Sequence, residues 1–125
     1  MLFRSTSDDG AISLRLDARQ WAETDWAGFS AHAFFQDPFS KRVNPEGWTT
    51  EAFSRAKAAM DETGRLATYS AATSVKRAMF EAGLWAASAP GPGRKREMTV
   101  ASPSRQVLEA DDMLEVLERE KYVVT

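Results

Sequence analysis

A chain of 125 residues can bury one small hydrophobic core, so we expect a single domain over residues 1–125. The hydrophobic fraction of 43% and the charged fraction of 27% exclude a disordered chain and a long coiled coil, and the absence of cysteine excludes disulfides, a thiol nucleophile and a cysteine-ligated metal. No apolar run approaches the ~18 residues of a membrane span, and no signal-peptide pattern begins the sequence, which predicts a soluble, cytoplasmic protein.

The net charge of -2 is unevenly distributed along the chain. Between Arg65 and Arg96, six basic residues, Lys76 and Arg77 among them, accompany a single acidic residue. From Glu109 onward the balance reverses and acidic residues dominate. A basic middle favours contact with a polyanion such as nucleic acid, although the same asymmetry also occurs on ordinary solvated surfaces.

Two strands are predicted in the first third of the chain. Apolar and polar residues alternate over Ala11–Leu16, and Asp17 ends this run. The mainly apolar stretch Ala31–Gln36 predicts a largely buried strand. Open α/β sheets carry their chemistry at the carboxyl ends of such strands, so Asp37 is a candidate base on a loop stiffened by two prolines. A simple turn is the competing interpretation of this segment.

Helical spacing and glycine or proline positions predict the remaining elements. The first is a helix from Thr49 or Thr50 to Met60, stopped by Gly64, and a strand at Leu66–Tyr69 follows it. Next comes a helix with Val75, Met79 and Ala82 on its apolar face, stopped by Gly83. Strands at Leu84–Ala89 and Glu97–Ala101 and a last helix through Leu108, Leu114 and Leu117 complete the set. The Pro90–Gly93 loop predicts antiparallel pairing of the last two strands. Together the elements predict a mixed α/β sheet, followed by a helical tail over residues 102–125.

Four ordered motifs resemble a known family. They are Asp37-Pro-Phe-Ser, Asn44-Pro-Glu-x-Trp48, Leu66-Ala-Thr-Tyr-Ser70-Ala-Ala and Gly91-x-Gly93-x-Lys95-Arg96-Glu-Met98. Their order and spacing are similar to the MnmC-like methyltransferase domain of the bacterial enzyme that completes 5-methylaminomethyl-2-thiouridine at the tRNA wobble position. The resemblance covers residues 11–101 and implies the class I, Rossmann-like fold of S-adenosylmethionine-dependent methyltransferases. The FAD-dependent oxidoreductase domain of some family members is not expected in this chain.

The resemblance also implies roles for individual residues. Asp37 would act as base or orienter beside the transferred methyl group and the substrate amine. Asp17 and Asp37 would contact S-adenosylmethionine, and tRNA would be the substrate. The substrate-side residues would be Asn44, Pro45, Trp48, Tyr69, Ser70, Lys95 and Arg96, the last two meeting tRNA phosphates. Core packing is the alternative role for Trp48 and Tyr69. No metal site is implied, because His32 is the only histidine and lies in the middle of a strand.

The sequence departs from this family at its start. A complete domain of this fold begins with a strand and a Gly-rich turn that approaches the methionine part of the cofactor, and no residue before Ala11 matches them. We therefore expect a partial sheet that lacks its first strands and binds S-adenosylmethionine weakly by itself. The alternative to a tRNA-methylating domain is a non-catalytic RNA- or protein-binding module derived from the fold. Ala11–Leu16 is expected to pair with Ala31–Gln36, unless a second copy of the chain or a missing N-terminal half covers that edge.

Overall fold

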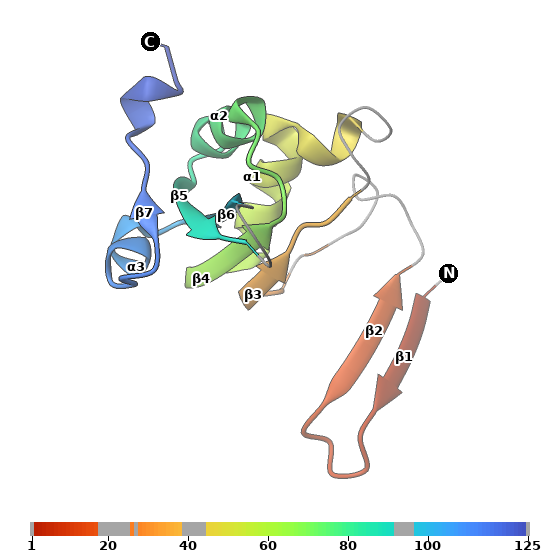
Figure 1. Cartoon of the computed structure of the whole chain (residues 1–125). Helices are drawn as coiled ribbons and strands as arrows, with labels where there is room; N and C mark the ends of the chain where they lie inside the picture. Colours follow the sequence, from red (N-terminus) through yellow and green to blue (C-terminus); the bar gives the residue numbers. More distant parts are fainter. Residues whose placement is uncertain (1, 18–25, 27, 39–44, 92–96, 125) are drawn as a thin grey trace.

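The computed structural model describes residues 2–17, 26, 28–38, 45–91 and 97–124, which form a five-stranded sheet with helices and a separate two-stranded hairpin (Figure 1). In chain order the elements are β1 (Leu2–Thr6), β2 (Ser13–Asp17), β3 (Ala31–Phe35), η2 (Pro45–Trp48), α1 (Thr50–Ala58), β4 (Met60–Thr68), α2 (Thr73–Glu81), β5 (Trp85–Pro90), β6 (Glu97–Ser102), α3 (Arg105–Glu109), β7 (Glu115–Val116) and η3 (Arg119–Lys121). None of the helices in these described ranges has the length and apolar content needed to cross a membrane.

The large sheet is mixed, as the sequence predicts. Its strand order is β3-β4-β6-β5-β7, and β3 pairs with β4 in parallel. Strand β6 runs antiparallel to both β4 and β5, so β3, β4 and β5 all point the same way. The predicted antiparallel hairpin of the last two strands is confirmed as β5 and β6. The carboxyl ends of three strands consequently meet at one end of the sheet.

The first predicted strand has a different partner from the one expected. β2 pairs antiparallel with β1, from Leu2 opposite Asp17 to Thr6 opposite Ser13, and not with β3. The turn between them is closed locally, because the Asp9 carboxylate accepts hydrogen bonds from the Ser7 hydroxyl at 2.7 Å and the Ala11 amide at 3.0 Å. Closing this short turn costs less chain entropy than pairing across a longer loop. The expectation that Ala11–Leu16 would pair with Ala31–Gln36 is therefore wrong.

Strand β3 keeps one open edge among the described residues, since β4 is its only partner there. Its Phe35 side chain is 77% exposed. Figure 1 shows the β1–β2 hairpin extending away from this strand. An open edge with apolar side chains is a template for strand addition.

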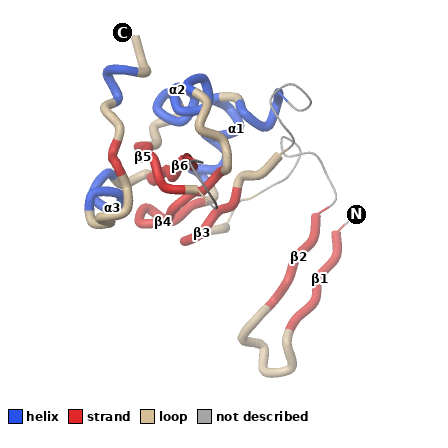
Figure 2. Tube along the Cα trace, in the orientation of Figure 1, coloured by secondary structure: helices blue, strands red, loops and turns tan. Residues whose placement is uncertain are grey.

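Helices α1 and α2 pack together on one side of the large sheet (Figure 2). Thr49 caps α1, because its hydroxyl accepts a hydrogen bond from the Ala52 amide at 3.1 Å. The largest buried side chains of the core, each at most 2% exposed, include Phe53, Leu66, Met79, Phe80 and Leu84. Gly83, with φ of 89°, ends α2 as predicted, because a left-handed residue at this position suits glycine.

Gly64 does not stop α1. The helix ends at Ala58, β4 begins at Met60, and Gly64 is a buried residue of that strand. The pairing of β3 with β4 jumps from Ala31 opposite Met60 to Ala33 opposite Arg65, so the residues between Met60 and Arg65 bulge. A Cβ atom at Gly64 would lie 2.5 Å from the Ala31 carbonyl oxygen. Glycine is needed here because the backbones of β3 and β4 approach closely.

The last predicted helix is shorter than the leucine spacing suggests. Leu108 is buried in α3, but the helix ends at Glu109, so Leu114 and Leu117 lie beyond it. The Asp111 carboxylate accepts a hydrogen bond from Arg65 Nη1 at 2.7 Å and another from the Met113 amide at 2.9 Å. These contacts turn the chain, and β7 then pairs with the edge of β5. The region expected as a helical tail thus contributes a strand to the sheet.

Replacing Gly64 with alanine should destabilise the fold, because the added Cβ cannot fit against the Ala31 carbonyl without a shift of β3. We expect a loss of about 1–3 kcal/mol in the free energy of unfolding, measured by chemical denaturation. Glu62→Ala in the same bulge is the matched control, since Glu62 is exposed, and should change stability by less than about 0.5 kcal/mol. Equal effects of the two substitutions would contradict this account of Gly64.

Candidate functional site at the carboxyl ends of β3 and β4

The parallel pairing of β3 and β4 places two chain ends side by side. Phe35 lies opposite Ala67, and the Gln36 amide donates to the Ala67 carbonyl oxygen at 2.9 Å, so the pairing continues one residue past β3. Asp37 follows directly and is exposed. Tyr69 follows β4 in the same way. Two of the residues singled out in the sequence therefore emerge from adjacent strands at one end of the sheet.

Gln36 ties the loop after β3 to η2. Its side chain is buried, and its Nε2 donates to the Gly47 carbonyl oxygen at 2.6 Å. Because Gly47 lies in η2, this bond holds the two ends of the loop that carries Asp37. From the sequence alone, Gln36 is expected only to end a strand. A polar residue between an apolar strand and a candidate catalytic acid was the available signal for its role.

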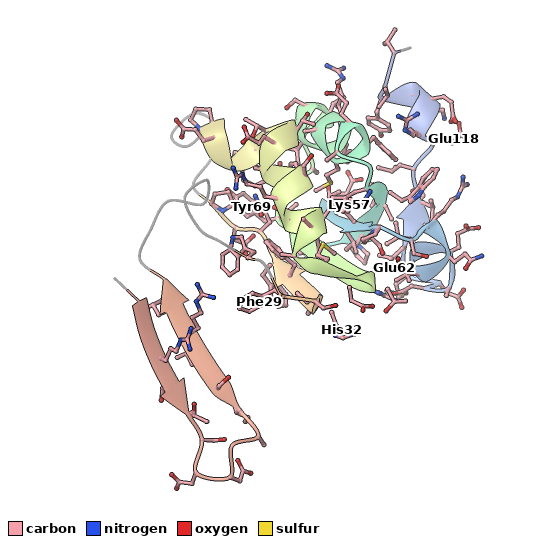
Figure 3. All side chains as sticks on the ribbon, turned by 180° about the vertical axis from the view of Figure 1, so that it is seen from behind. Phe29, His32, Lys57, Glu62, Tyr69 and Glu118 are labelled. Carbon is pink, nitrogen blue, oxygen red and sulfur yellow. The ribbon has the colours of Figure 1, made fainter. Side chains whose placement is uncertain are left out.

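Tyr69 joins the same assembly from the β4 side (Figure 3). Its hydroxyl donates to the Pro38 carbonyl oxygen at 2.9 Å, and its ring meets the Trp48 ring edge-on with centroids 5.7 Å apart. Trp48 is only 4% exposed and belongs to the hydrophobic core, whereas Tyr69 is 47% exposed. Trp48 thus packs in the core, which is the alternative to direct ligand contact. Its ring supports the Tyr69 ring, which solvent can reach.

Ser70 is held by the neighbouring antiparallel strand. Its carbonyl oxygen accepts a hydrogen bond from Thr99 Oγ1 at 2.7 Å, and its hydroxyl accepts one from the Ala72 amide at 3.3 Å. Thr68 and Thr99 lie opposite each other on β4 and β6, and both are buried. The turn that leads from β4 into α2 is therefore fixed by side chains as well as by the sheet.

Lys76 and Arg77 differ in how they are held, although they are neighbours in the basic middle of the chain. The Lys76 side chain is 8% exposed, and its Nζ lies 3.4 Å from Glu97 Oε1. A hydrogen bond from Ser88, and then the charge of Lys76, hold the pKa of Glu97 below its ordinary value. Arg77 Nε donates to the Tyr122 carbonyl oxygen at 2.9 Å. The basic middle predicted from the sequence therefore loses Lys76 as a candidate for contact with a polyanion, whereas Arg77 is exposed and keeps its charge at the surface.

The structure brings some of the predicted site residues together and leaves others apart. Asp37, Tyr69 and Ser70 gather at one end of the sheet, with Pro45 and Trp48 in η2 beside them. Asp17 ends β2 in the two-stranded hairpin, outside the five-stranded sheet. The remaining predicted positions, Asn44, Lys95 and Arg96, lie outside the described residues.

Comparison with known proteins yields a consistent set of relatives. Residues 4–104 match the family model described as S-adenosyl-L-methionine-dependent methyltransferase. The chain is 42% identical over 73 residues to the tRNA 5-methylaminomethyl-2-thiouridine biosynthesis bifunctional protein MnmC of Ralstonia nicotianae, a match that covers 58% of this chain and 11% of the relative. The protein of the same name from Cupriavidus metallidurans is 43% identical over 103 residues, covering 80% of this chain and 15% of the relative.

A solved structure agrees with these sequence matches. The crystal structure of MNMC2 from Aquifex aeolicus superposes with a TM-score of 0.60 at 38% sequence identity, covering 67% of this chain and 27% of that one. The chain therefore spans only a small part of the length of the relatives that it matches, 11% and 15% for the two named above.

Replacing Gln36 with methionine keeps the length of the side chain and removes the donor to Gly47. We expect the free energy of unfolding to fall by about 1–3 kcal/mol, because a buried carbonyl loses its hydrogen bond. Gln106→Met on the exposed side of α3 is the control and should be nearly neutral. Denaturant titration of both variants tests the assignment, and equal stability of the two would contradict it.

Proposed function

Because the chain belongs to the S-adenosyl-L-methionine-dependent methyltransferase family, we propose that it forms the substrate side of a tRNA methyltransferase site. The proposed reaction is methylation of the aminomethyl group on the wobble uridine. Two findings support it: the family is one of methyltransferases, and the name of the MnmC relatives specifies 5-methylaminomethyl-2-thiouridine biosynthesis in tRNA. The observation that carries the proposal is the placement of exposed Asp37 at the end of β3, beside a half-exposed Tyr69 ring at the end of β4.

Asp37 has the chemistry that methylation of an amine requires. An amine attacks through its lone pair, so it must be neutral when it reacts, and a carboxylate at hydrogen-bond distance can orient the amine and accept its proton. The bonds from Gln36 to Gly47 and from Tyr69 to Pro38 hold the backbone on both sides of Asp37. A loop fixed in this way would keep the carboxylate in one place relative to the substrate.

The described residues fit the cofactor only in part. S-adenosylmethionine, when bound, would supply an electrophilic methyl group at the end of the sheet where Asp37 lies. Close approach of the backbone to its methionine part calls for glycine with positive φ, and the described glycines of that kind are Gly10, Gly28 and Gly83. They lie in the hairpin turn, before β3 and before β5, which are not at this end of the sheet. Weak cofactor binding by this chain alone stays a prediction.

Recognition of tRNA is proposed for two kinds of side chain. The exposed part of the Tyr69 ring is suited to stacking on an unpaired base, which is how proteins commonly hold single-stranded RNA. Lys95 and Arg96 are proposed to contact phosphates, on the resemblance of their motif alone. Asn44 and Pro45 are proposed to line the substrate side for the same reason. Asp17 is kept as a proposed cofactor contact.

A second candidate function rests on the open edge of β3. In this alternative the chain is a non-catalytic module that binds RNA or protein, and a second copy or another polypeptide adds a strand beside Ala31–Phe35. The 77% exposed Phe35 side chain favours such a contact, because added cover would remove apolar surface from water.

The role of Asp37 can be tested in a chimera in which residues 4–104 replace the matching segment of the Cupriavidus metallidurans relative. Methyl transfer from labelled S-adenosylmethionine to tRNA that carries 5-aminomethyl-2-thiouridine is the measurement. Asp37→Asn should lower the single-turnover rate by about 10²–10⁴, the usual contribution of a positioned base. Asp8→Asn, in the exposed hairpin turn, is the control and should leave the rate unchanged. An unchanged rate in Asp37→Asn would overturn the assigned role, and an inactive parent chimera that binds tRNA would favour the non-catalytic alternative.

Binding of tRNA by the full chain should weaken steeply as salt rises, because phosphate contacts release counterions. Replacing Lys95 and Arg96 with alanine should reduce the salt slope by about one unit for each lost phosphate contact, with little change in melting temperature. Lys121→Ala is the control, since Lys121 is exposed in the acidic end of the chain and pairs with Glu118. Filter binding over a salt series decides the matter, and an unchanged slope in the double variant would remove the proposed phosphate contacts.

A further inference from the structure

A buried lysine lies at the same end of the sheet as Asp37 and Tyr69 and has no role in the site as described so far. Lys76 belongs to α2, and its side chain is 8% exposed. Lysine is rarely buried to this degree unless its ammonium group has a charged partner. That partner is Glu97, 3.4 Å away, the first residue of β6.

Glu97 connects three elements. It begins β6, it pairs with Lys76 of α2, and it accepts a hydrogen bond from Ser88 of β5. Its own side chain is 48% exposed, so the carboxylate lies at the boundary between the buried ammonium group and solvent. Glu97 is the acid of the Gly91–Met98 motif, and the partners described for it, Lys76 and Ser88, hold neighbouring elements together.

The next step leads from β6 to the candidate site. Thr99 is on the same face of β6 as Glu97, two residues along the strand, and is fully buried. Its hydroxyl donates to the Ser70 carbonyl oxygen at 2.7 Å, directly after Tyr69. Lys76 therefore holds the beginning of β6 through Glu97. The beginning of β6 in turn holds the Tyr69–Ser70 turn through Thr99.

We propose that Lys76 and Glu97 are a positioning pair, whose ion pair fixes the first residues of β6 and through Thr99 the Tyr69–Ser70 turn. The positional part of this inference stands on the contacts alone. Its consequence for methyl transfer rests on the proposed function, because it requires Tyr69 to contact the substrate.

Variants can separate positioning from stability. Replacing a buried ion pair by apolar side chains is often neutral or stabilising, whereas removing one partner leaves a buried charge. The double variant Lys76→Met/Glu97→Met should therefore remain folded but lose the ion pair that fixes the start of β6, and with it the fixed position of Thr99. Lys76→Arg keeps the positive charge and should keep Thr99 in place. Arg65→Met, which removes the half-exposed pair with Asp111, is the control.

The first measurement uses the full 125-residue chain and follows amide hydrogen exchange and chemical shifts by NMR. In the double variant, exchange at Ser70 and Thr99 should rise by about tenfold, as expected for loss of one charge-assisted hydrogen bond, and the Tyr69 ring signals should shift. Lys76→Arg should show wild-type values, and so should Arg65→Met at these three residues. Wild-type exchange and shifts in the folded double variant would overturn the proposal.

The second measurement uses the chimera and separates kcat from KM. The double variant should lower kcat for methyl transfer while KM for S-adenosylmethionine stays unchanged, and Lys76→Arg should recover kcat. An unchanged kcat together with altered Tyr69 signals would overturn the catalytic consequence of the pair. If the parent chimera is inactive, the proposed function fails, and the exchange measurement on the full chain still decides whether the pair positions the turn.

Discussion

The parallel pairing of β3 with β4 is the constraint on which the candidate site depends. Parallel strands end at the same side of a sheet, so Asp37 and Tyr69, which are separated by more than thirty residues in the chain, leave the sheet as neighbours. The close backbone contact at Gly64 lies on this pair of strands. Any change that moves β3 relative to β4 would move the carboxylate relative to the aromatic ring.

Most of the buried polar residues in the described part of the chain lie at this end of the sheet, and they hold the loops of the site in place. Taken as whole residues, Gln36, Thr68, Lys76 and Thr99 are at most 6% exposed. Gln36 and Thr99 donate to carbonyl oxygens of the segments around Asp37 and Tyr69, and Lys76 pairs with Glu97 at the start of β6. The core between α1, α2 and the sheet is otherwise apolar. Buried polar groups in a medium of low dielectric hold a definite geometry only when they are paired. The apolar core supplies the platform, and the hydrogen bonds set the positions of the loops upon it.

The sequence predicts the parts of this fold that depend on local signals. Gly83 marks the end of α2, and the Pro90–Gly93 segment marks the antiparallel return of the chain, because both act within a few residues. The motif residues Asp37 and Tyr69 were placed at strand ends for the same reason. The β1–β2 hairpin and the true role of Gly64 were missed, since both depend on which segment lies opposite. The pairing of Lys76 with Glu97 was missed because residues far apart in sequence meet only after the sheet has formed.

The two edges of the large sheet differ in a way that limits how copies of the chain could assemble. One edge is β7, which has only two residues, begins with Glu115 and follows the acidic stretch after α3. The other is β3, with five residues and an exposed Phe35. Strand addition is more favourable at β3 than at β7. A short charged strand such as β7 offers few backbone groups for hydrogen bonding and repels a copy of itself. In the strand addition proposed above, growth through the edges of the described sheet would stop when two β3 strands have met, which would give a closed pair and no extended filament.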